Sequence, residues 1–234
     1  IRVEYELLPA VFDPQEAMGE DAPRLHDGVE NNVGWALKLT EGNPEEAFGR
    51  CAHVIEDRFF SEKISHVPME PYGALANFEA GKLHIWAPNM APFTKRKGLS
   101  NMLGLPVPMV RIHHVTIGGA FGSRSDTYPM EFSAALLSMK SGRPVRIQCT
   151  QDETMAVTRM MHGAVMDVKM GFAGDGTLLA GDIRFILDGG AYLSSGVMAT
   201  NAGGHHYSAT YRMPNFKYEG LRVYTNKTTC NMHR

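Results

Sequence analysis

Cysteine is scarce in this sequence, which has only Cys51, Cys149 and Cys230 among 234 residues and no CxxC pair. This sparse, odd count excludes a disulfide framework and a cysteine-rich metal site, and it fits a reducing compartment, so we expect a cytoplasmic protein. No apolar run approaches the roughly 20 residues that a membrane-spanning helix needs. The formal net charge is only −2, which gives no indication of a nucleic-acid partner.

Histidine is more frequent, and four of the ten histidines form the adjacent pairs His113-His114 and His205-His206. Neighbouring residues on a strand point to opposite faces, so neither pair is a ready two-ligand metal site. We therefore expect structural roles for these histidines and no protein side chain as a metal ligand.

The most informative stretch is residues 117–124, in which three glycines and an alanine surround Phe121. Residues 110–117 are rich in β-branched side chains and predict a buried strand, and Pro129 opens an apolar pattern typical of one helix face. The glycines would let a loop between them adopt positive φ and approach a ligand, whose anionic oxygens its N–H groups can bind. A tight connection without a ligand is an equally good interpretation of the loop alone. The spacing excludes the dinucleotide-binding fingerprint.

Periodicity elsewhere predicts a mixture of strands and helices. The strongest signals are two hairpins, residues 74–78 with 82–86 and residues 165–172 with 178–187. Further strands are expected over residues 1–8, 53–60, 145–149 and 221–224, helices over 44–48 and 93–103, a loop over 10–33, and a small-residue segment around 194–201.

Seven phrases occur in one order along the chain: residues 1–11, 66–71, 104–106 with 110–112, 118–122, 141–145 with 152–153, 188–192 and 223–226. They resemble, in this order, the large molybdopterin-binding subunit of the molybdenum hydroxylases, the xanthine dehydrogenase and aldehyde oxidase family. Residues 66–71 (HVPMEP) and 118–122 (GGAFG) are similar to the HxPMEP segment and the GGxFG loop of that family. No single phrase is decisive, but seven in order are specific.

The resemblance implies an α+β fold with mixed sheets and packed helices, part of the molybdopterin-binding domain. Residues 1–35 would end the N-terminal α/β (hammerhead-like) domain of the family, 36–50 would be a linker, and 51–234 an incomplete first molybdopterin-binding domain. The chain starts without Met and stops at Arg234. We therefore expect a fragment, inactive alone, because the general-base glutamate of the family would lie further on.

The implied cofactor is molybdenum-molybdopterin, in the cytosine dinucleotide form, with iron–sulfur clusters and FAD on partner subunits in a dimer of heterotrimers. The implied activity is that of an oxidoreductase. It would hydroxylate, or reductively dehydroxylate, an aldehyde, N-heterocycle or aromatic acyl-CoA with water-derived oxygen. The protein would position the cofactor and the small-molecule substrate.

The resemblance also assigns candidate site residues. Phe121 and Arg234 would be catalytic, the first as a wall of the substrate site and the second as a fork of donors. Asn89 stands where the family often has a glutamine whose amide bonds an oxo ligand, although a simple turn residue is an equal alternative. The full cofactor-binding set is Asn89, Gly118, Gly119, Ala120, Phe121, Gly122 and Arg234.

Departures from the family pattern narrow the substrate. Ser125 stands where purine-oxidising members have a glutamate, and residues 201–204 lack their arginine, which argues against purine recognition. Residues 218–226 followed by Cys230 most resemble 4-hydroxybenzoyl-CoA reductase-type subunits. Two alternatives stay open: a carbon monoxide dehydrogenase large subunit, and a non-catalytic binding module with the same fold.

Overall fold

The computed structural model describes residues 2–233, apart from the side chains of Ser195 and Ser208. The chain divides into two compact units, unit 1 from residues 2–64 and 162–231, and unit 2 from residues 65–161 with 232 and 233. Each unit has its own sheet and its own buried apolar cluster. Unit 1 joins two segments far apart in the sequence, so strand pairing rather than chain order sets the division.

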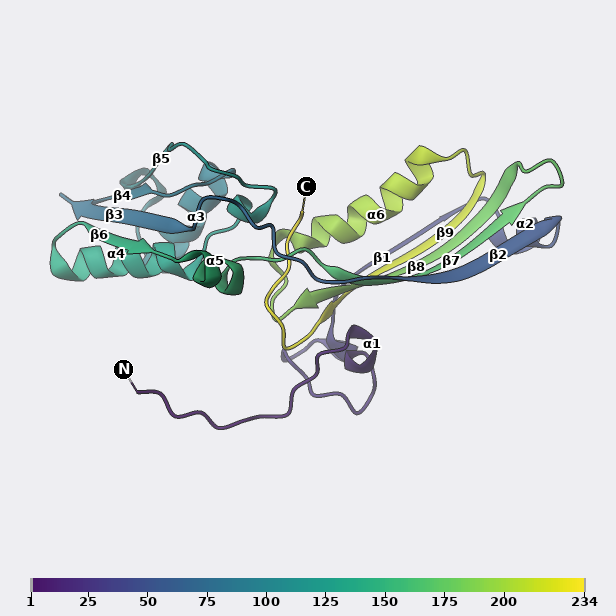
Figure 1. The fold of residues 1–234 in the computed structure, drawn as a ribbon, viewed down its shortest axis with the longest axis horizontal. Helices are drawn as coiled ribbons and strands as arrows, with labels where there is room; N and C mark the ends of the chain where they lie inside the picture. Colours follow the sequence, from purple (N-terminus) through teal and green to yellow (C-terminus); the bar gives the residue numbers. More distant parts are fainter. Residues whose placement is uncertain (1, 234) are drawn as a thin grey trace. The chain divides into compact units, whose positions relative to one another are not determined.

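Unit 1 is built on a five-stranded sheet with the order β1-β9-β8-β7-β2 (Figure 1). All neighbours are antiparallel except β8 and β9, which run parallel, so the sheet is mixed. The strands are β1 (Val33–Glu41), β2 (His53–Ser61), β7 (Gly163–Phe172), β8 (Leu178–Gly190) and β9 (Asn215–Tyr224). The hairpin of β7 and β8 confirms the prediction from the Gly-Asp-Gly turn.

The two faces of this sheet are covered differently. Helix α6 (Val197–Thr210) runs along one face, over an apolar cluster that includes Ile183 and Tyr218 (Figure 1). Helix α1 (Pro14–Ala17) packs on residues of opposite parity, among them Ile186 and Leu221. The remaining short elements of the unit are α2 (Pro44–Phe48), η1 (Glu30–Asn32) and η4 (Ser194–Gly196).

Helix α6 falls on the stretch that the sequence marked only as small residues around 194–201. The sequence did not predict this helix, because Gly203 and Gly204 have low helix propensity. The structure gives these glycines a packing role. A Cβ on Gly203 would come within 2.7 Å of the Tyr218 hydroxyl, and one on Gly204 within 2.9 Å of Leu39. Helix α6 therefore lies close to the sheet because these two residues are glycines, which have no side chain.

Three expectations for the N-terminal region need correction. Residues 2–8 form no strand, because alternating polarity supplies no pairing partner, and Tyr5 and Leu7 are exposed. Residues 10–33 contain α1 and η1 rather than loop alone. Strand β1 was missed, because its β-branched content is low and its register comes from β9.

Unit 2 contains a four-stranded sheet with the order β5-β4-β3-β6, in which only β4 and β5 are parallel. Its strands are β3 (Gly73–Glu79), β4 (Lys82–Trp86), β5 (Val110–His113) and β6 (Val145–Gln148). Its helices are α3 (Pro92–Leu103), α4 (Pro129–Ser141) and α5 (Gln151–Val157), with η2 (Val107–Met109) and η3 (Ser123–Ser125). Mixed sheets with packed helices in both units confirm the α+β fold.

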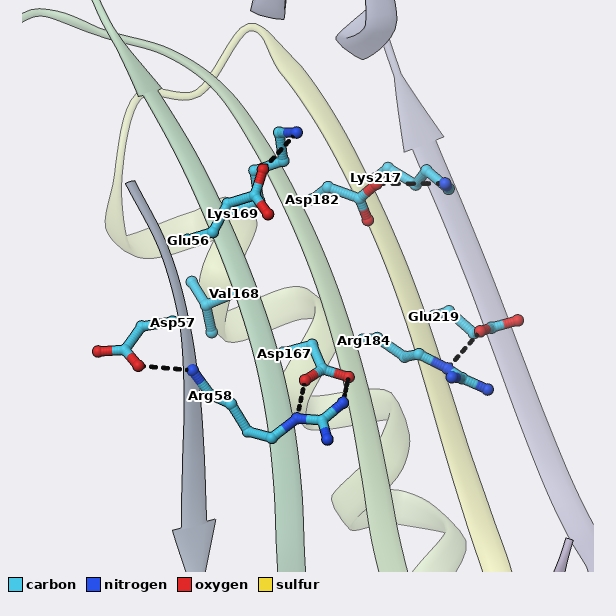
Figure 2. Close-up of a pocket in the computed structure, with 10 residues that line it drawn as sticks. All are labelled: Glu56, Asp57, Arg58, Asp167, Val168, Lys169, Asp182, Arg184, Lys217 and Glu219. Atoms are coloured by element: carbon cyan, nitrogen blue, oxygen red, sulfur yellow. Dashed lines mark hydrogen bonds and ion pairs between the residues drawn. The ribbon is translucent and has the colours of Figure 1, made fainter. Parts of the chain in front are cut away.

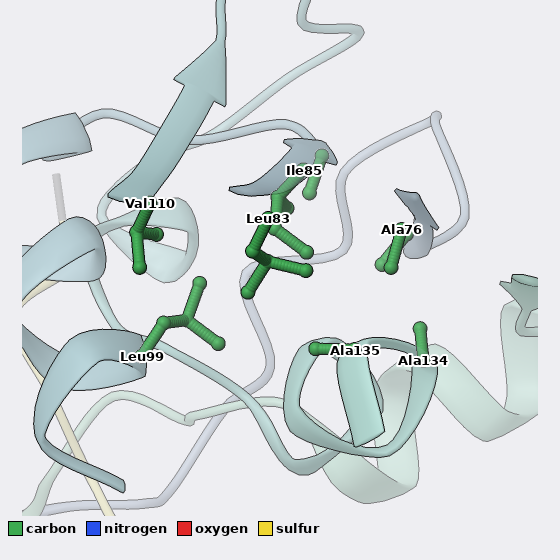
Figure 3. Packing of buried hydrophobic residues seen from close by; sticks show 9 residues of the cluster. Ala76, Leu83, Ile85, Leu99, Val110, Ala134 and Ala135 are labelled. Carbon is green, nitrogen blue, oxygen red and sulfur yellow. The ribbon is translucent and has the colours of Figure 1, made fainter. Parts of the chain in front are cut away.

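The core of unit 2 lies between this sheet and its helices. Leu83 and Ile85 from β4 meet Leu99 of α3 and Ala135 of α4, and all four are fully buried (Figure 3). Burial of a side chain of the size of leucine or isoleucine contributes about 1.5–3 kcal/mol. This packing fixes the positions of β4 and β5. The chain that follows β5 leads into the candidate site.

Strand β5 ends earlier than predicted, at His113 rather than at residue 117. The reason is the length of its one partner, because β4 stops at Trp86, which pairs with His113. Residues 114–122 therefore leave the sheet as an irregular segment. This segment carries the glycine loop.

Candidate functional site

The glycine loop, residues 118–122, has an unusual backbone. Gly119 and Gly122 have φ values of +111° and +99°, which side-chain-bearing residues rarely adopt. Phe121 also lies in the left-handed region, with φ of +48°, although it carries a large side chain. Such conformations persist where surrounding contacts over-determine them, and they cluster at functional sites.

Close packing explains why two of these positions need glycine. A Cβ on Gly118 would come within 2.7 Å of the Glu70 Cβ, and one on Gly122 within 2.3 Å of the Met232 carbonyl oxygen. At Gly119 the nearest atoms, in Phe121 and Pro68, would be 3.2 Å away. The loop therefore packs closely against Glu70 and Met232 at these two positions.

Glu70 anchors the start of the loop. Its carboxylate accepts a hydrogen bond of 2.9 Å from the Gly118 N–H, and its own N–H donates to the Gly118 carbonyl oxygen at 3.0 Å. The structure thus brings together residues 66–71 and 118–122, the two phrases most typical of the family. No pattern in the sequence predicted a contact between them.

Arg124 is a residue of this site that sequence reasoning missed. Its side chain is fully buried, and its Nη2 donates to the Glu70 carbonyl oxygen at 2.6 Å while its Nε donates to the Gly119 carbonyl oxygen at 3.4 Å. The guanidinium carbon lies 4.6 Å from the centre of the Tyr72 ring. Burial lowers the pKa of Arg124 from its ordinary value. Arg124 therefore binds both the loop and its anchor.

A buried polar network continues from Arg124 beneath the loop. Lys95 and Glu131 form a fully buried ion pair, Lys95 Nζ donates to the Tyr72 hydroxyl at 3.0 Å, and that hydroxyl donates to Glu131. Glu131 also accepts from the Tyr128 N–H at 2.9 Å, and the Tyr128 hydroxyl donates to the Ser123 carbonyl oxygen. Burial raises the pKa of Tyr72 well above its usual range, so this phenol stays neutral. The network connects α3 and α4 to the loop.

The loop keeps donors available. Ser123 N–H donates to the Ala120 carbonyl oxygen at 2.8 Å, whereas the N–H groups of residues 119–122 have no hydrogen-bond partner within residues 2–233. The Phe121 ring is 50% exposed. Four successive N–H donors beside glycines fit a ligand with anionic oxygens, such as the oxygen ligands of an oxidised metal centre.

Asn89 is buried, and its amide Nδ2 donates to the Ala87 carbonyl oxygen at 3.1 Å. The next residue, Met90, donates its N–H to the Arg124 carbonyl oxygen at 2.9 Å, which ties this segment to the end of the loop. An amide nitrogen carries two protons, so one stays available to a ligand. The other predicted residue, Arg234, lies outside the described residues.

A hollow of about 570 Å³ lies elsewhere, on the five-stranded sheet of unit 1. Figure 2 shows that its side chains pair across the strands. Arg58 binds Asp167, Lys169 lies 2.6 Å from Glu56, and Lys217 lies 3.2 Å from Asp182. A fourth carboxylate, that of Glu219, lies 3.0 Å from Arg184. We call these side chains the charge lattice. They satisfy one another and offer no unpaired group for catalysis.

Two kinds of feature are absent from residues 2–233. No three histidine, cysteine, aspartate or glutamate side chains lie together in an arrangement that could hold a metal ion. No helix in that part of the chain is long and apolar enough to cross a membrane.

Comparison with known proteins establishes the family. The sequence matches the molybdopterin cofactor-binding domain over residues 25–234. The chain therefore belongs to the molybdopterin cofactor-binding domain family. This match confirms the resemblance to the xanthine dehydrogenase and aldehyde oxidase family that the ordered phrases indicated.

Individual relatives are longer than this chain. It is 30% identical to the nicotinate dehydrogenase large molybdopterin subunit of Eubacterium barkeri, over 100% of this chain and 55% of that protein. It is 28% identical to the xanthine dehydrogenase molybdenum-binding subunit of Escherichia coli O157:H7, over 100% of this chain and 31% of that protein. The structure resembles the aldehyde oxidoreductase of Desulfovibrio gigas with a TM-score of 0.94 and 27% identity, over 100% of this chain and 26% of that one. The chain thus spans about half or less of these relatives.

Proposed function

We propose that this chain is part of a molybdenum oxidoreductase large subunit, and that residues 118–122 contact the metal end of the molybdopterin cofactor. One observation carries the proposal. The four successive N–H groups of residues 119–122 donate no hydrogen bond to any described residue. Donors fixed before a ligand arrives stabilise its charge without reorganisation. Membership of the molybdopterin cofactor-binding domain family supports this cofactor as the ligand.

When bound, the molybdenum cofactor supplies the redox chemistry, and the chain contributes binding and orientation. The N–H groups of residues 119–122 hold anionic oxygens in place. The half-exposed Phe121 ring offers a flat apolar wall to an aldehyde, an N-heterocycle or an aromatic acyl-CoA. Asn89 contributes its remaining amide proton, and Arg234 a second set of donors.

The finer features of the parent protein are further parts of this proposal. Ser125 in place of a glutamate supports a non-purine substrate. The cytosine dinucleotide form of the cofactor, partner subunits with iron–sulfur clusters and FAD, and a dimer of heterotrimers follow the family pattern.

The test is Gly119→Val in the complete polypeptide that carries this chain, with its partner subunits. A β-branched side chain resists the φ of +111° at this position and pushes against Pro68 and Phe121. Loss of one preorganised donor typically costs about 100–1,000-fold in turnover. We expect this loss with the thermal unfolding midpoint little changed, measured together with molybdenum and pterin content.

Gly142→Val is the matched control, because Gly142 also has a positive φ but a Cβ there meets nothing within 4 Å. Full turnover of Gly119→Val would show that the loop is only a connection. Lost folding together with lost turnover would show a structural glycine. A purified parent protein without molybdenum would instead favour the non-catalytic binding module.

A further inference from the structure

His66 is the first residue of the phrase 66–71, and the proposed function gives it no role. Its side chain is only 6% exposed, and it belongs to unit 2 together with the glycine loop. Both ring nitrogens face backbone carbonyl oxygens, because Nδ1 lies 3.0 Å from the Arg159 oxygen and Nε2 lies 2.8 Å from the Met232 oxygen. The ring therefore lies between two segments that are far apart in the sequence.

The Met232 carbonyl oxygen also packs against the glycine loop. A Cβ on Gly122 would come within 2.3 Å of this oxygen and within 3.4 Å of His66 Nε2. Gly122, His66 and Met232 thus meet at one oxygen atom. Arg234, a predicted site residue, is two positions further along the chain than Met232. The contact with His66 therefore fixes, beside the glycine loop, the point from which the chain continues to Arg234.

The number of protons on His66 decides how many of these two contacts are hydrogen bonds. A neutral imidazole has one N–H group and one nitrogen with a lone pair. It can donate to the Arg159 oxygen or to the Met232 oxygen, and the other oxygen then faces the lone pair. Only the doubly protonated ring donates to both oxygens. A second proton on His66 thus adds a hydrogen bond that the neutral ring cannot make.

The ionisable groups around the ring oppose this second proton. The ring centroid of His233 lies 4.8 Å from that of His66, and the charge of Arg124 is also close. The Arg159 guanidinium, by contrast, is paired with Asp126 at 2.8 Å. Burial lowers the pKa of His66 from its ordinary value of 6.5, although the two carbonyl contacts act in the raising direction. The ring is therefore neutral at pH 7 and takes up its second proton below pH 6.5.

We propose that His66 is a positioning residue of the candidate site, which holds the Met232 carbonyl group beside Gly122 by a proton-dependent hydrogen bond. The neutral ring holds this group when its proton is on Nε2. With the proton on Nδ1, it binds the Arg159 oxygen instead, and a second proton ends this competition. The hydrogen bond follows from contacts within unit 2, whereas its effect on turnover rests on the proposed function.

Two amide variants separate the two contacts, because the glutamine NH₂ group reaches the position of Nε2 and the shorter asparagine only that of Nδ1. His66→Gln thus keeps a donor for the Met232 oxygen, His66→Asn keeps one for the Arg159 oxygen, and neither side chain titrates. The measurements are turnover of the complete protein and hydrogen–deuterium exchange in the peptide that contains Met232. We expect His66→Asn to exchange faster and turn over more slowly, each by about five- to tenfold, as for one lost hydrogen bond. His66→Gln should match the parent, and exposed His53→Asn is the control.

A pH series tests the proton itself and needs no variant that might fail to fold. After correction for the intrinsic pH dependence of exchange, the Met232 peptide of the parent should become more protected between pH 7.5 and pH 5.5, whereas that of His66→Gln should not change. Equal behaviour of His66→Asn and His66→Gln, or constant protection in the parent, would overturn the proposal. If the exchange pattern holds in a complete protein that contains no molybdenum, the proposed function fails and the hydrogen bond of His66 stands.

Discussion

Arg124 contacts Glu70 at both its backbone and its side chain. Its Nη2 donates to the Glu70 carbonyl oxygen at 2.6 Å and lies 3.9 Å from the Glu70 carboxylate. That same carboxylate accepts from the Gly118 N–H. The buried cation of Arg124 thus binds Glu70, and Glu70 in turn binds Gly118, the first glycine of the loop. Arg124 itself follows the loop in sequence.

The first prediction concerns this arginine in the complete protein. Arg124→Met removes hydrogen bonds from a charged donor, each contributing about 1.5–3 kcal/mol, and frees Glu70 and the Gly119 carbonyl oxygen. We expect a lower unfolding midpoint in urea and a lower molybdenum content. Arg124→Lys keeps the charge without the planar fork and should recover only part of both. Exposed Arg146→Met is the control, and equal stability of the two methionine variants would contradict the prediction.

The second prediction concerns the ion pair of Lys95 and Glu131, both fully buried. Lys95→Met leaves the Glu131 carboxylate without its cation, which for a buried pair costs about 3–5 kcal/mol. The double variant Lys95→Met with Glu131→Gln should be more stable than Lys95→Met alone, because the neutral amide leaves no buried charge unpaired and its one oxygen still accepts from one of the two donors, the Tyr72 hydroxyl or the Tyr128 N–H. Urea unfolding of the single and double variants measures this coupling. Simple additivity of the two changes would show that the pair does not act as a unit.

The third prediction concerns acid stability of unit 1. Burial, with the nearby charges of Arg222 and Lys63, lowers the pKa of His162 to about 3 from an ordinary value of 6.5. Between these values the unfolded chain binds a proton that the folded chain does not, so stability is complete above about pH 6.5 and falls as the pH drops towards 3. The slope from this group reaches about 1.4 kcal/mol per pH unit.

His162→Gln should flatten that slope, because glutamine cannot take up the proton in the unfolded chain. Urea unfolding between pH 4 and pH 7.5 measures it for both proteins. Exposed His53→Gln on β2 serves as the control. An unchanged slope in His162→Gln would show that other groups cause the acid sensitivity.

The fourth prediction concerns the glycines of α6. Alanine favours a helix over glycine by about 1 kcal/mol, yet Gly204→Ala should destabilise unit 1, because its Cβ would come within 2.9 Å of Leu39 and Tyr218. Gly98→Ala in α3 is the comparison, since its nearest atom is the Thr127 hydroxyl at 3.3 Å, which can rotate. Chemical unfolding that ranks Gly204→Ala as the more stable variant would contradict close packing of α6.

Local patterns predicted much of this fold, and distant contacts account for most of what they missed. The Gly174-Asp175-Gly176 turn and the alternation around it were enough for the β7–β8 hairpin, and Gly104 with Pro106 for the end of α3. The end of β5 depended on the length of β4, which no periodicity within β5 contains. Helix α6 was not predicted, because the glycines that allow its close packing also weaken its helical pattern.

In the candidate site too, local patterns were predictable from the sequence and distant contacts were not. Glycines 118, 119 and 122 stood out in the sequence as a cluster, and positive φ at Gly119 and Gly122 accounts for two of them. Arg124 looked like any polar residue after a loop, since its burial arises from Glu70, 54 positions earlier. Nothing local in the sequence distinguishes a buried arginine from a solvated one.

The charge lattice of unit 1 has a consequence for the electric field around the protein. Its charges alternate in sign from strand to strand, at the spacing of about 4.8 Å between neighbouring strands. Alternating charges cancel beyond a few such spacings, so this face neither attracts nor repels a distant ion, whatever the salt concentration. Replacing one of them, as in Lys169→Ala, would leave Glu56 without its cation and extend a negative potential to the Debye length of about 8 Å at physiological salt.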